Sequence, residues 1–365
     1  MIKTLHQLLL VCVLFAGTFG IACADSYERG VWWDFSAIDK ENMTSEISAM
    51  RKYGVSRVHV QISHPVFGMK LYEDCKAAQP KSVGSCAAKK YSFNFDTWAD
   101  TSARKVNLGD FVDELRRNGM KVVLMIWPIP TAQYVASLKR LTDFTKRHEV
   151  YAIETEAEEN WDMKYSNGDF PDLAAASKSL LDTLRTTLPA GVKIAVTTAP
   201  RNFSASHFQS DAILFKSADI VSFQSYQNIY SDDGSRVTYA NLSGDYAVGT
   251  MQKRAIDTFL KIASPQTELI LGLPAYDQAS PTMSGEISMY IAAKQSVCGS
   301  DQVGKRFIGG NYWSWANIKS KKRDASYAKR FLENCRPEKI ALQCSKTAQP
   351  PQMEELTAAC PALFK

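Results

Sequence analysis

Three glutamates at every second position form the stretch of this chain best equipped for chemistry. In the segment EVYAIETEAEENWD (149–162) they are Glu154, Glu156 and Glu158. Side chains two residues apart share one face of a β-strand, so the three carboxylates would form a column while Ile153 faces the other way. Carboxylates held this close cannot all be ionised comfortably. We therefore expect one or more pKa values to rise, which leaves a protonated acid near neutral pH.

A protonated and an ionised carboxyl group side by side are what the cleavage of a glycosidic bond requires. One group protonates the leaving oxygen, and another stabilises the positive charge that develops at the sugar carbon. An exposed acidic edge or a salt-bridged network would explain the same spacing without any chemistry. The elements around the column decide between these alternatives.

Polar side chains alternate with apolar ones in three further β-rich segments. They are His59, Gln61 and Ser63 in 57–63, Ser222, Gln224 and Tyr226 in 219–226, and Asn311, Trp313 and Trp315 in 307–315. Facing the glutamates, they would supply the partners that buried charges need. We expect Gln61 and Gln224 to contact a substrate. Glu159, one step off the glutamate face, is a further candidate that a shift of register would bring in.

Five tryptophans fall at or just beyond the ends of predicted strands. They are Trp33, Trp127, Trp161, Trp313 and Trp315. Aromatic faces hold sugar rings through their C–H faces and also shape apolar clefts, so the set predicts a substrate-binding mouth. For any one of these tryptophans, packing in the core is the alternative.

The elements that must position these residues follow an alternating pattern. The β-rich segments are 30–35, 57–63, 121–127, 150–158, 193–199, 219–226, 268–273 and 307–315. Apolar residues recur at helical spacing between them, as in 170–189 and 248–263. The alternation predicts an α/β fold, a closed (β/α)8 TIM barrel with its active site at the carboxyl ends of the strands. A doubly wound open sheet is the alternative, but no glycine-rich phosphate loop follows the first segment.

We expect three parts in the chain. They are a signal peptide (1–24), a glycosidase-like barrel (25–335) and a short C-terminal tail (336–365). The connection at 64–106 is too long for a plain turn and predicts an extended loop with its own disulfide after the second strand.

The first residues have the pattern of an export signal. Lys3 precedes an apolar segment at 8–22, and the motif ACA predicts cleavage near Ala24. We therefore expect a secreted or periplasmic protein, with a lipoprotein attached at Cys23 as the less favoured alternative. No later segment has the about 18 apolar residues needed to span a bilayer, so we expect no permanent membrane span.

Six cysteines remain after that cleavage: Cys75, Cys86, Cys298, Cys335, Cys344 and Cys360. An even number in an exported chain indicates disulfides rather than a metal site. Six cysteines can pair in fifteen different ways. Local pairing would join Cys75 to Cys86 and Cys344 to Cys360, which leaves Cys298 with Cys335.

Composition and missing motifs narrow the function further. The 365-residue chain has a mild net charge of +5, and the cationic run KSKKR at 319–323 is short. Without a basic stripe we expect no nucleic acid partner. No C-x-x-C or histidine cluster occurs, so we expect no metal and no cofactor. The motif G-x-S-x-G is also absent, so we expect no serine nucleophile of that type. We expect a monomer whose partner is a polysaccharide or another glycan.

Several segments together resemble glycoside hydrolase family 18, the chitinase-like barrels, from about 29 to 335. KIAVTTAP resembles the fifth strand of the family, and ADIVSFQSYQ resembles the sixth, which carries an M-x-Y-D motif. ELILGLPAYD is similar to the strand-7 segment GlPaYg, and FIGGNYWSW to the GGvmxW of strand 8. The segments occur in the order and at the spacing of the family.

The catalytic signature of that family, D-x-x-D-x-D-x-E, aligns with Tyr151, Glu154, Glu156 and Glu158. The resemblance implies that Glu158 is the general acid/base. It implies that Glu156 holds the acetamido group of the substrate, which itself attacks the anomeric carbon, and that Glu154 tunes Glu156. It also implies that Tyr226 donates a hydrogen bond to the acetamido oxygen.

This chain departs from the family pattern at several positions. Tyr151 replaces the first aspartate of the signature, Glu154 and Glu156 replace two others, Gln227 ends the M-x-Y-D motif, and Met125, Trp127 and Pro128 stand in the S-x-G-G of strand 3. The strand-8 tryptophan of the family corresponds to either Trp313 or Trp315. These changes imply a distant branch, with a different glycan or a mechanism in which a second carboxylate acts directly.

Taken together, the residues and the resemblance predict an exported glycoside hydrolase that cleaves β-linked glycans containing N-acetylhexosamine, such as peptidoglycan or chitin. A catalytically silent barrel that binds glycan or inhibits another enzyme is one alternative. A lysozyme-like muramidase on the same scaffold is another.

Overall fold

The computed structural model describes residues 28–34, 38, 40–62, 106–157, 161–198, 205–224, 255, 257–274 and 306–319. The predicted signal peptide, the tail, the cysteines and nearly all of the connection at 64–106 lie outside these ranges, so those expectations stay predictions.

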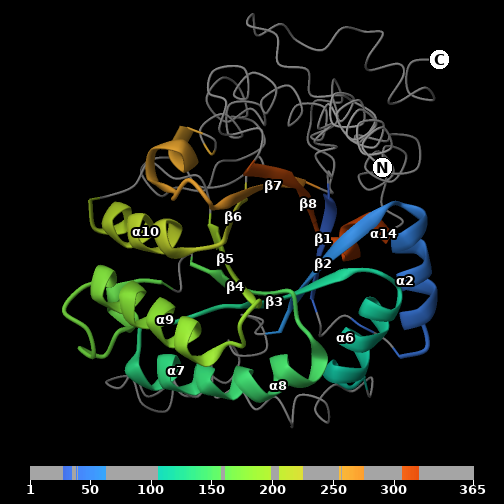
Figure 1. Ribbon diagram of the computed structural model, residues 1–365, viewed down its shortest axis with the longest axis horizontal. Coiled ribbons are helices and arrows are strands. Elements are labelled where there is room, and N and C mark those ends of the chain that lie inside the picture. Colours follow the sequence, from blue (N-terminus) through green and yellow to red (C-terminus); the bar gives the residue numbers. More distant parts are fainter. Residues whose placement is uncertain are drawn as a thin grey trace, which may run out of the picture.

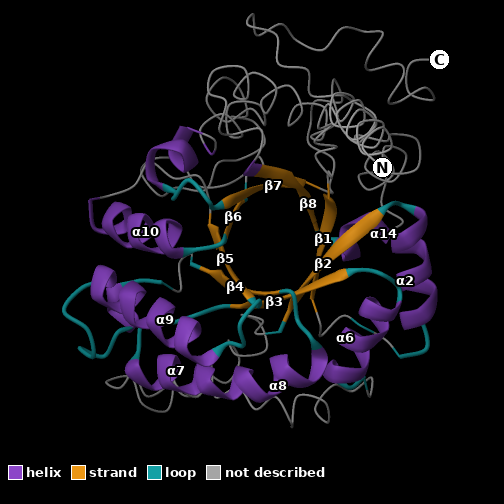
Figure 2. Cartoon of the chain, in the orientation of Figure 1, coloured by secondary structure: helices purple, strands orange, loops and turns teal. Residues whose placement is uncertain are grey.

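The described strands form one closed, parallel, eight-stranded barrel (Figure 2). They are β1 (Glu28–Asp34), β2 (Val55–Gln61), β3 (Lys121–Ile126), β4 (Ala152–Glu156), β5 (Lys193–Thr198), β6 (Ile220–Phe223), β7 (Glu268–Pro274) and β8 (Phe307–Trp313). Each strand pairs in parallel with the next, and β8 pairs with β1. The predicted (β/α)8 barrel is therefore confirmed and the open sheet is wrong.

Helices surround the ring of strands (Figure 1). They are α2 (Met43–Lys52), α6 (Leu108–Arg117), α7 (Ala132–Ser137), α8 (Leu141–His148), α9 (Leu173–Thr187), α10 (Ala205–Ser217) and α14 (Trp315–Lys319), with 3-10 turns η2 (Leu138–Arg140) and η3 (Met163–Tyr165). The pattern at 170–189 is confirmed as α9. Of the pattern at 248–263, the described residues 255 and 257–262 are helical.

Helix α9 shows how the sequence sets these boundaries. Asp172 caps its first turn by accepting a hydrogen bond from the backbone nitrogen of Ala175 at 2.7 Å. Leu173, Leu180 and Leu184 recur at helical spacing and are buried against the barrel. The apolar stripe predicted from the sequence is thus the face that packs on the strands.

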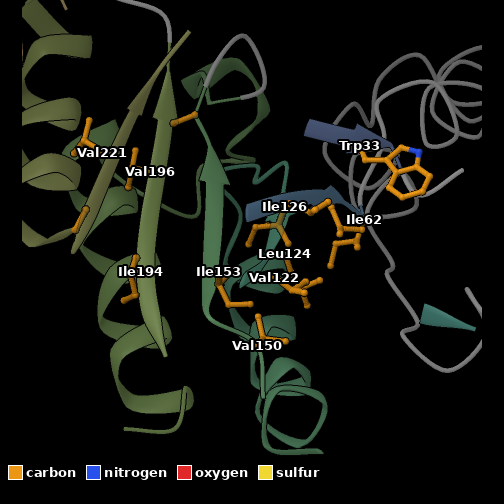
Figure 3. Packing of buried hydrophobic residues seen from close by; sticks show 14 of the residues in the cluster. Trp33, Ile62, Val122, Leu124, Ile126, Val150, Ile153, Ile194, Val196 and Val221 are labelled. Carbon is orange, nitrogen blue, oxygen red and sulfur yellow. The ribbon is translucent and has the colours of Figure 1, made fainter. Parts of the chain in front are cut away.

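The main core lies between the strands and the helices. Outward side chains of neighbouring strands fill it, such as Leu124 of β3, Ile153 of β4 and Val196 of β5, all fully buried (Figure 3). Because side chains alternate along a strand, the residues directly before and after each of these three point into the barrel. Glu154 is one of them.

Strand register sorts the inward side chains of the even strands into layers, because the strands of a barrel are staggered. One layer holds His59, Glu154, Ser222 and Asn311, and the layer above it holds Gln61, Glu156, Gln224 and Trp313. An apolar cluster lies beneath, formed by Val123, Ala152, Ala195, Ile220 and Ile270. Below these two layers the interior is therefore apolar on the side of β3 to β7.

The amino-terminal end of the barrel carries its own charged residues. Glu28 of β1 pairs with Lys121 of β3, and Lys193 of β5 lies 2.7 Å from Glu268 of β7. The ring of Tyr151 lies between the two lysines, with its centroid 4.7 Å from Lys121 Nζ and 5.2 Å from Lys193 Nζ. We call this set the lower ion-pair group.

No helix in the described ranges is long and apolar enough to cross a membrane.

Candidate active site

Two of the three glutamates in the predicted column are described, and both point into the barrel. Glu154 contacts side chains of β1 and β2, and Glu156 contacts side chains of β2 and β6. The inward direction predicted from the two-residue spacing is confirmed for this pair. Glu158 and Glu159 lie outside the described residues, as does Tyr226.

Glu154 is fully buried and is held by neutral donors. Its Oε2 accepts a hydrogen bond from Nδ1 of His59 at 2.6 Å and one from Nε1 of Trp32 at 3.3 Å. Its other oxygen, Oε1, is buried without a hydrogen-bond partner among the described residues, and so is the hydroxyl of Ser222 in the same layer. At 0% exposure Glu154 is out of reach of a ligand in the mouth of the barrel.

The protonation of His59 follows from its other neighbours. Its Nε2 lies 3.0 Å from Nε of Arg57 and 2.7 Å from Nδ2 of Asn311. A guanidinium nitrogen can only donate, so Nε2 must accept and the ring proton must reside on Nδ1, facing Glu154. Burial lowers the pKa of His59 below its ordinary value, and the charge of Arg57 acts the same way, against the effects of Glu154 and Glu28.

Arg57 connects this layer to the bottom of the barrel. Its Nη2 donates to Oδ1 of Asn311 at 2.9 Å, and its Nη1 donates to Oε2 of Glu28 at 2.6 Å. Gly30 makes the space for these groups, because a Cβ at that position would lie 1.7 Å from Oδ1 of Asn311. A glycine in β1 therefore permits a guanidinium to occupy the barrel interior.

Glu156 lies one layer higher and is held by two amides. Nε2 of Gln224 donates to its Oε1 at 2.9 Å, and Nε2 of Gln61 lies 3.5 Å from its Oε2. The second contact is at the long limit for a hydrogen bond. Glu156 keeps 5% exposure, whereas Glu154 has none. Within the described part of the column, Glu156 is thus the carboxylate nearer the open end.

Two tryptophans line the interior at this level. The rings of Trp32 in β1 and Trp313 at the end of β8 meet edge to face, with centroids 6.0 Å apart. Both pack against Met125 of β3. Of the two predicted strand-8 tryptophans, the inward one is Trp313. It leads through a cis peptide bond to Ser314, which lies directly before α14.

The structure corrects the predicted placement of three tryptophans at the mouth. Trp33 faces outward and packs on Phe111 and Trp315, at ring distances of 5.0 and 6.3 Å. Trp315 begins α14 instead of ending β8, and Trp161 is also buried in the outer core. A substrate-binding role for these side chains has no support from their positions.

Trp161 is held in that core by two hydroxyls. Its Nε1 lies 3.1 Å from Oγ of Ser177 in α9 and 3.1 Å from Oγ of Ser210 in α10. Trp127 follows β3 directly at the predicted end of the barrel and is half-buried, and it packs against the same outer core.

Sequence reasoning missed Trp32 and Arg57. Trp32 shares its face with Asp34, and a polar residue on that face indicated that it, and not Trp33, points inward. Arg57 continues the face of His59 and Gln61 downward, by the same alternation. The alternation of polar and apolar residues therefore indicated the inward face in both strands. The residue types alone, two adjacent tryptophans and an arginine at the start of a strand, do not reveal which face is buried.

The site can orient two carboxyl groups in the buried interior of the barrel. Donors to Glu154 and Glu156 include an imidazole, an indole and two amides, which are neutral groups. Donors of this kind favour the ionised carboxylate without cancelling its charge. Such an arrangement stabilises positive charge that develops next to it. Among the described residues no group of three histidine, cysteine, aspartate or glutamate side chains could hold a metal ion.

Comparisons with known proteins found similarity to solved structures alone. No family model matches the chain, and no curated protein sequence matches it. Similar solved structures include a chitinase from Rhizomucor miehei, with 14% identity and a TM-score of 0.44, covering 82% of this chain and 97% of that one. Concanavalin B gives 14% identity and a TM-score of 0.43, covering 84% of this chain and 98% of that one.

A ligand-free tryptophan synthase of M. tuberculosis is similar to the same degree, with 8% identity and a TM-score of 0.42, covering 85% of this chain and 92% of that one. All three neighbours are (β/α)8 barrels, and their chemistries differ. Since one barrel supports many reactions, the function has to be argued from the side chains of the site.

Proposed function

We propose that the protein is an exported glycoside hydrolase that cleaves β-linked glycans containing N-acetylhexosamine, with Glu158 as general acid/base. The observation that carries the proposal is the position of Glu156. It lies inside the barrel at the carboxyl end of β4, oriented by Gln61 and Gln224. Glu158 follows it by two positions in the sequence, the spacing that continues the column.

Glu156 is better suited than Glu154 to act on the substrate. Glu154 is fully buried, and its Oε2 is already shared by His59 and Trp32. Glu156 lies above it and retains some exposure. This supports Glu156 as the group that holds a substrate acetamido nitrogen or, for a glycan without one, attacks the sugar carbon directly.

The proposed reaction divides the work between two carboxyl groups. Glu158 gives its proton to the glycosidic oxygen as the bond from that oxygen to the anomeric carbon breaks. The acetamido oxygen or a carboxylate oxygen of Glu156 forms a new bond to the anomeric carbon. Water then attacks that carbon and gives a proton to Glu158, and the bond from the carbon to the acetamido or Glu156 oxygen breaks. The negative charge of Glu156 stabilises the positive charge in both transition states.

The test is product analysis with Glu158→Gln. Wild type and variant would be incubated with purified peptidoglycan and with chitin oligomers, and released fragments measured by mass spectrometry. Loss of a general acid predicts a fall in kcat of about 10²–10⁴-fold with folding and glycan binding retained. Asp182→Asn, an exposed carboxylate paired with Lys178 on α9, is the matched control and should leave turnover unchanged.

The same experiment separates the alternatives. Retained activity in Glu158→Gln would overturn the assignment of the acid, and loss in Glu159→Gln instead would indicate a shift of register. Glycan binding without any product from the wild type would indicate a silent barrel. Fragments of peptidoglycan that end in reducing N-acetylmuramic acid would indicate a muramidase.

A further inference from the structure

We propose that His59 is a positioning residue for the column: locked by Arg57 and Asn311 in its neutral, Nδ1-protonated form, it holds and orients the carboxyl group of Glu154 beneath Glu156. This inference rests on the proposed function for its catalytic consequence. It rests on hydrogen-bond geometry for the lock.

The lock consists of two donors that converge on one nitrogen. Nε of Arg57 and Nδ2 of Asn311 both donate to Nε2 of His59, at 3.0 and 2.7 Å. The amide of Asn311 is itself oriented, because its Oδ1 accepts from Nη2 of Arg57 at 2.9 Å. Turning that amide over would set its nitrogen against a guanidinium that can only donate. The ring therefore cannot take a second proton while the three side chains stay in place.

The charged groups around His59 come from three strands. Arg57 lies on β2 itself, Glu28 on β1 and Glu154 on β4, while β8 contributes the neutral Asn311. The positive charge of Arg57 is partly balanced by its contact with Glu28 at 2.6 Å. His59 therefore separates the guanidinium from Glu154 and passes on a hydrogen bond in place of a cation.

Replacing a cation by a neutral donor matters for the layer above. A cation in direct contact with Glu154 would cancel its charge, whereas the Nδ1–H of His59, at 2.6 Å, orients the carboxylate and leaves its charge in place. Trp32 adds a second neutral donor at 3.3 Å. A carboxyl group oriented in this way presents its partial negative charge from directly beneath Glu156, where it favours positive charge on a substrate above the two residues.

Nuclear magnetic resonance of the histidine rings tests the lock. The chain has five histidines, and in the mature protein His59 should show a protonated Nδ1 and an unprotonated Nε2 from about pH 5 to 8. His148 is the internal control, since it also contacts a carboxylate, Asp113 at 3.1 Å, but lies half-buried on α8. A proton on Nε2 of His59, or uptake of a second proton in this range, would overturn the proposal.

Two substitutions test the positioning role. In His59→Asn the new amide nitrogen stands close to where Nδ1 was and can still donate to Glu154. In His59→Gln the amide stands close to Nε2, so Glu154 loses its short donor. We expect His59→Gln to lower kcat/KM by about 10–100-fold, as for a lost hydrogen bond to a charged group, with the acidic limb of the pH profile moved to higher pH.

His59→Asn should stay within about tenfold of the wild type and keep the position of that limb. His148→Gln should change neither kcat/KM nor the position of the acidic limb. Circular dichroism and thermal unfolding establish that each variant is folded. Equal losses in the two His59 variants, with an unmoved acidic limb, would overturn the positioning role. A wild type without turnover on either glycan would overturn the proposed function, and the ring protons would still decide the lock.

Discussion

Carboxylate side chains lie at both ends of the barrel, but the side chains that contact them differ between the two ends. At the amino-terminal end Glu28 and Glu268 contact cations, namely Arg57, Lys121 and Lys193. Toward the carboxyl end Glu154 and Glu156 are held by neutral side chains. Contact with a cation cancels the charge of a carboxylate locally, whereas a hydrogen bond from a neutral donor orients the carboxylate and does not cancel its charge.

This difference assigns the two ends separate roles. In a (β/α)8 barrel the amino-terminal face serves stability and the carboxyl-terminal face carries catalysis. The lower ion-pair group fits the first role, since its partners offset the cost of burying charge. A negative charge on the upper carboxylates would act more strongly on a nearby positive charge in this buried environment than it would in water.

The largest effect should come from Arg57→Met, because Arg57 is the residue that joins the two ends. The change leaves Glu28 with one cation fewer and leaves His59 and Asn311 without a buried donor. Breaking such a group should lower the free energy of unfolding by about 3–5 kcal/mol, measured by urea unfolding of the mature protein. Arg117→Met, whose side chain is 67% exposed beside Glu114, is the control, and its change should stay within about 0.5 kcal/mol.

A slightly smaller effect is expected when the same change is made at each end. Glu156→Gln removes the upper charge and should lower kcat by about 10²–10³-fold with little change in unfolding. Glu268→Gln removes a carboxylate from the lower ion-pair group and should leave turnover unchanged. Similar losses of turnover in both variants would remove the distinction between the ends.

Acid should weaken the upper layer through His59. The pKa of the folded ring is lowered, chiefly by burial, so the folded state stays neutral while the unfolded chain binds a proton below about pH 6.5. The contribution of His59 to stability is therefore full above that pH and declines by up to about 1.4 kcal/mol for each unit below it. The difference in unfolding free energy between wild type and His59→Asn should shrink as the pH falls from 7.5 to 5, and a constant difference would contradict this.

The smallest effect concerns alkaline pH at the lower end. Burial would lower the pKa of Lys193, but its hydrogen bonds with Glu268 and Tyr151 outweigh burial and raise it. A raised lysine pKa adds stability that is present below about pH 10.4 and lost as pH rises through the folded value. Because Lys193 is partly exposed, Lys193→Met should cost at most about 1 kcal/mol at neutral pH and flatten the alkaline decline seen in thermal unfolding.

The alternation of strand and helix segments predicted the barrel correctly, since every predicted strand corresponds to a described one. Period-two alternation also predicted that Glu154, Glu156, His59, Gln61 and Gln224 share the interior, because one face of each strand had to meet the apolar helices. These inferences depend on local patterns only, which a single sequence displays in full.

What the sequence did not reveal depends on distances between strands. The two donors on His59 come from residues 57 and 311, and no pattern within either strand announces that they converge on one nitrogen. Trp33 and Trp315 were misplaced because an aromatic residue near a strand end fits the mouth and the outer core equally well. Their burial against Phe111 and Tyr53 decides for the core.

The anchoring of Trp161 bears on how this barrel could be re-engineered. Thr198 Oγ1 holds the carbonyl of Ala157 at 3.1 Å, and two serine hydroxyls hold the indole of Trp161. Residues 158–160, with the proposed acid among them, thus stand between two fixed points on the scaffold. A library that varies only Glu159 and Asn160, and keeps Glu158 and both fixed points, would explore new leaving groups and linkages without rebuilding the barrel.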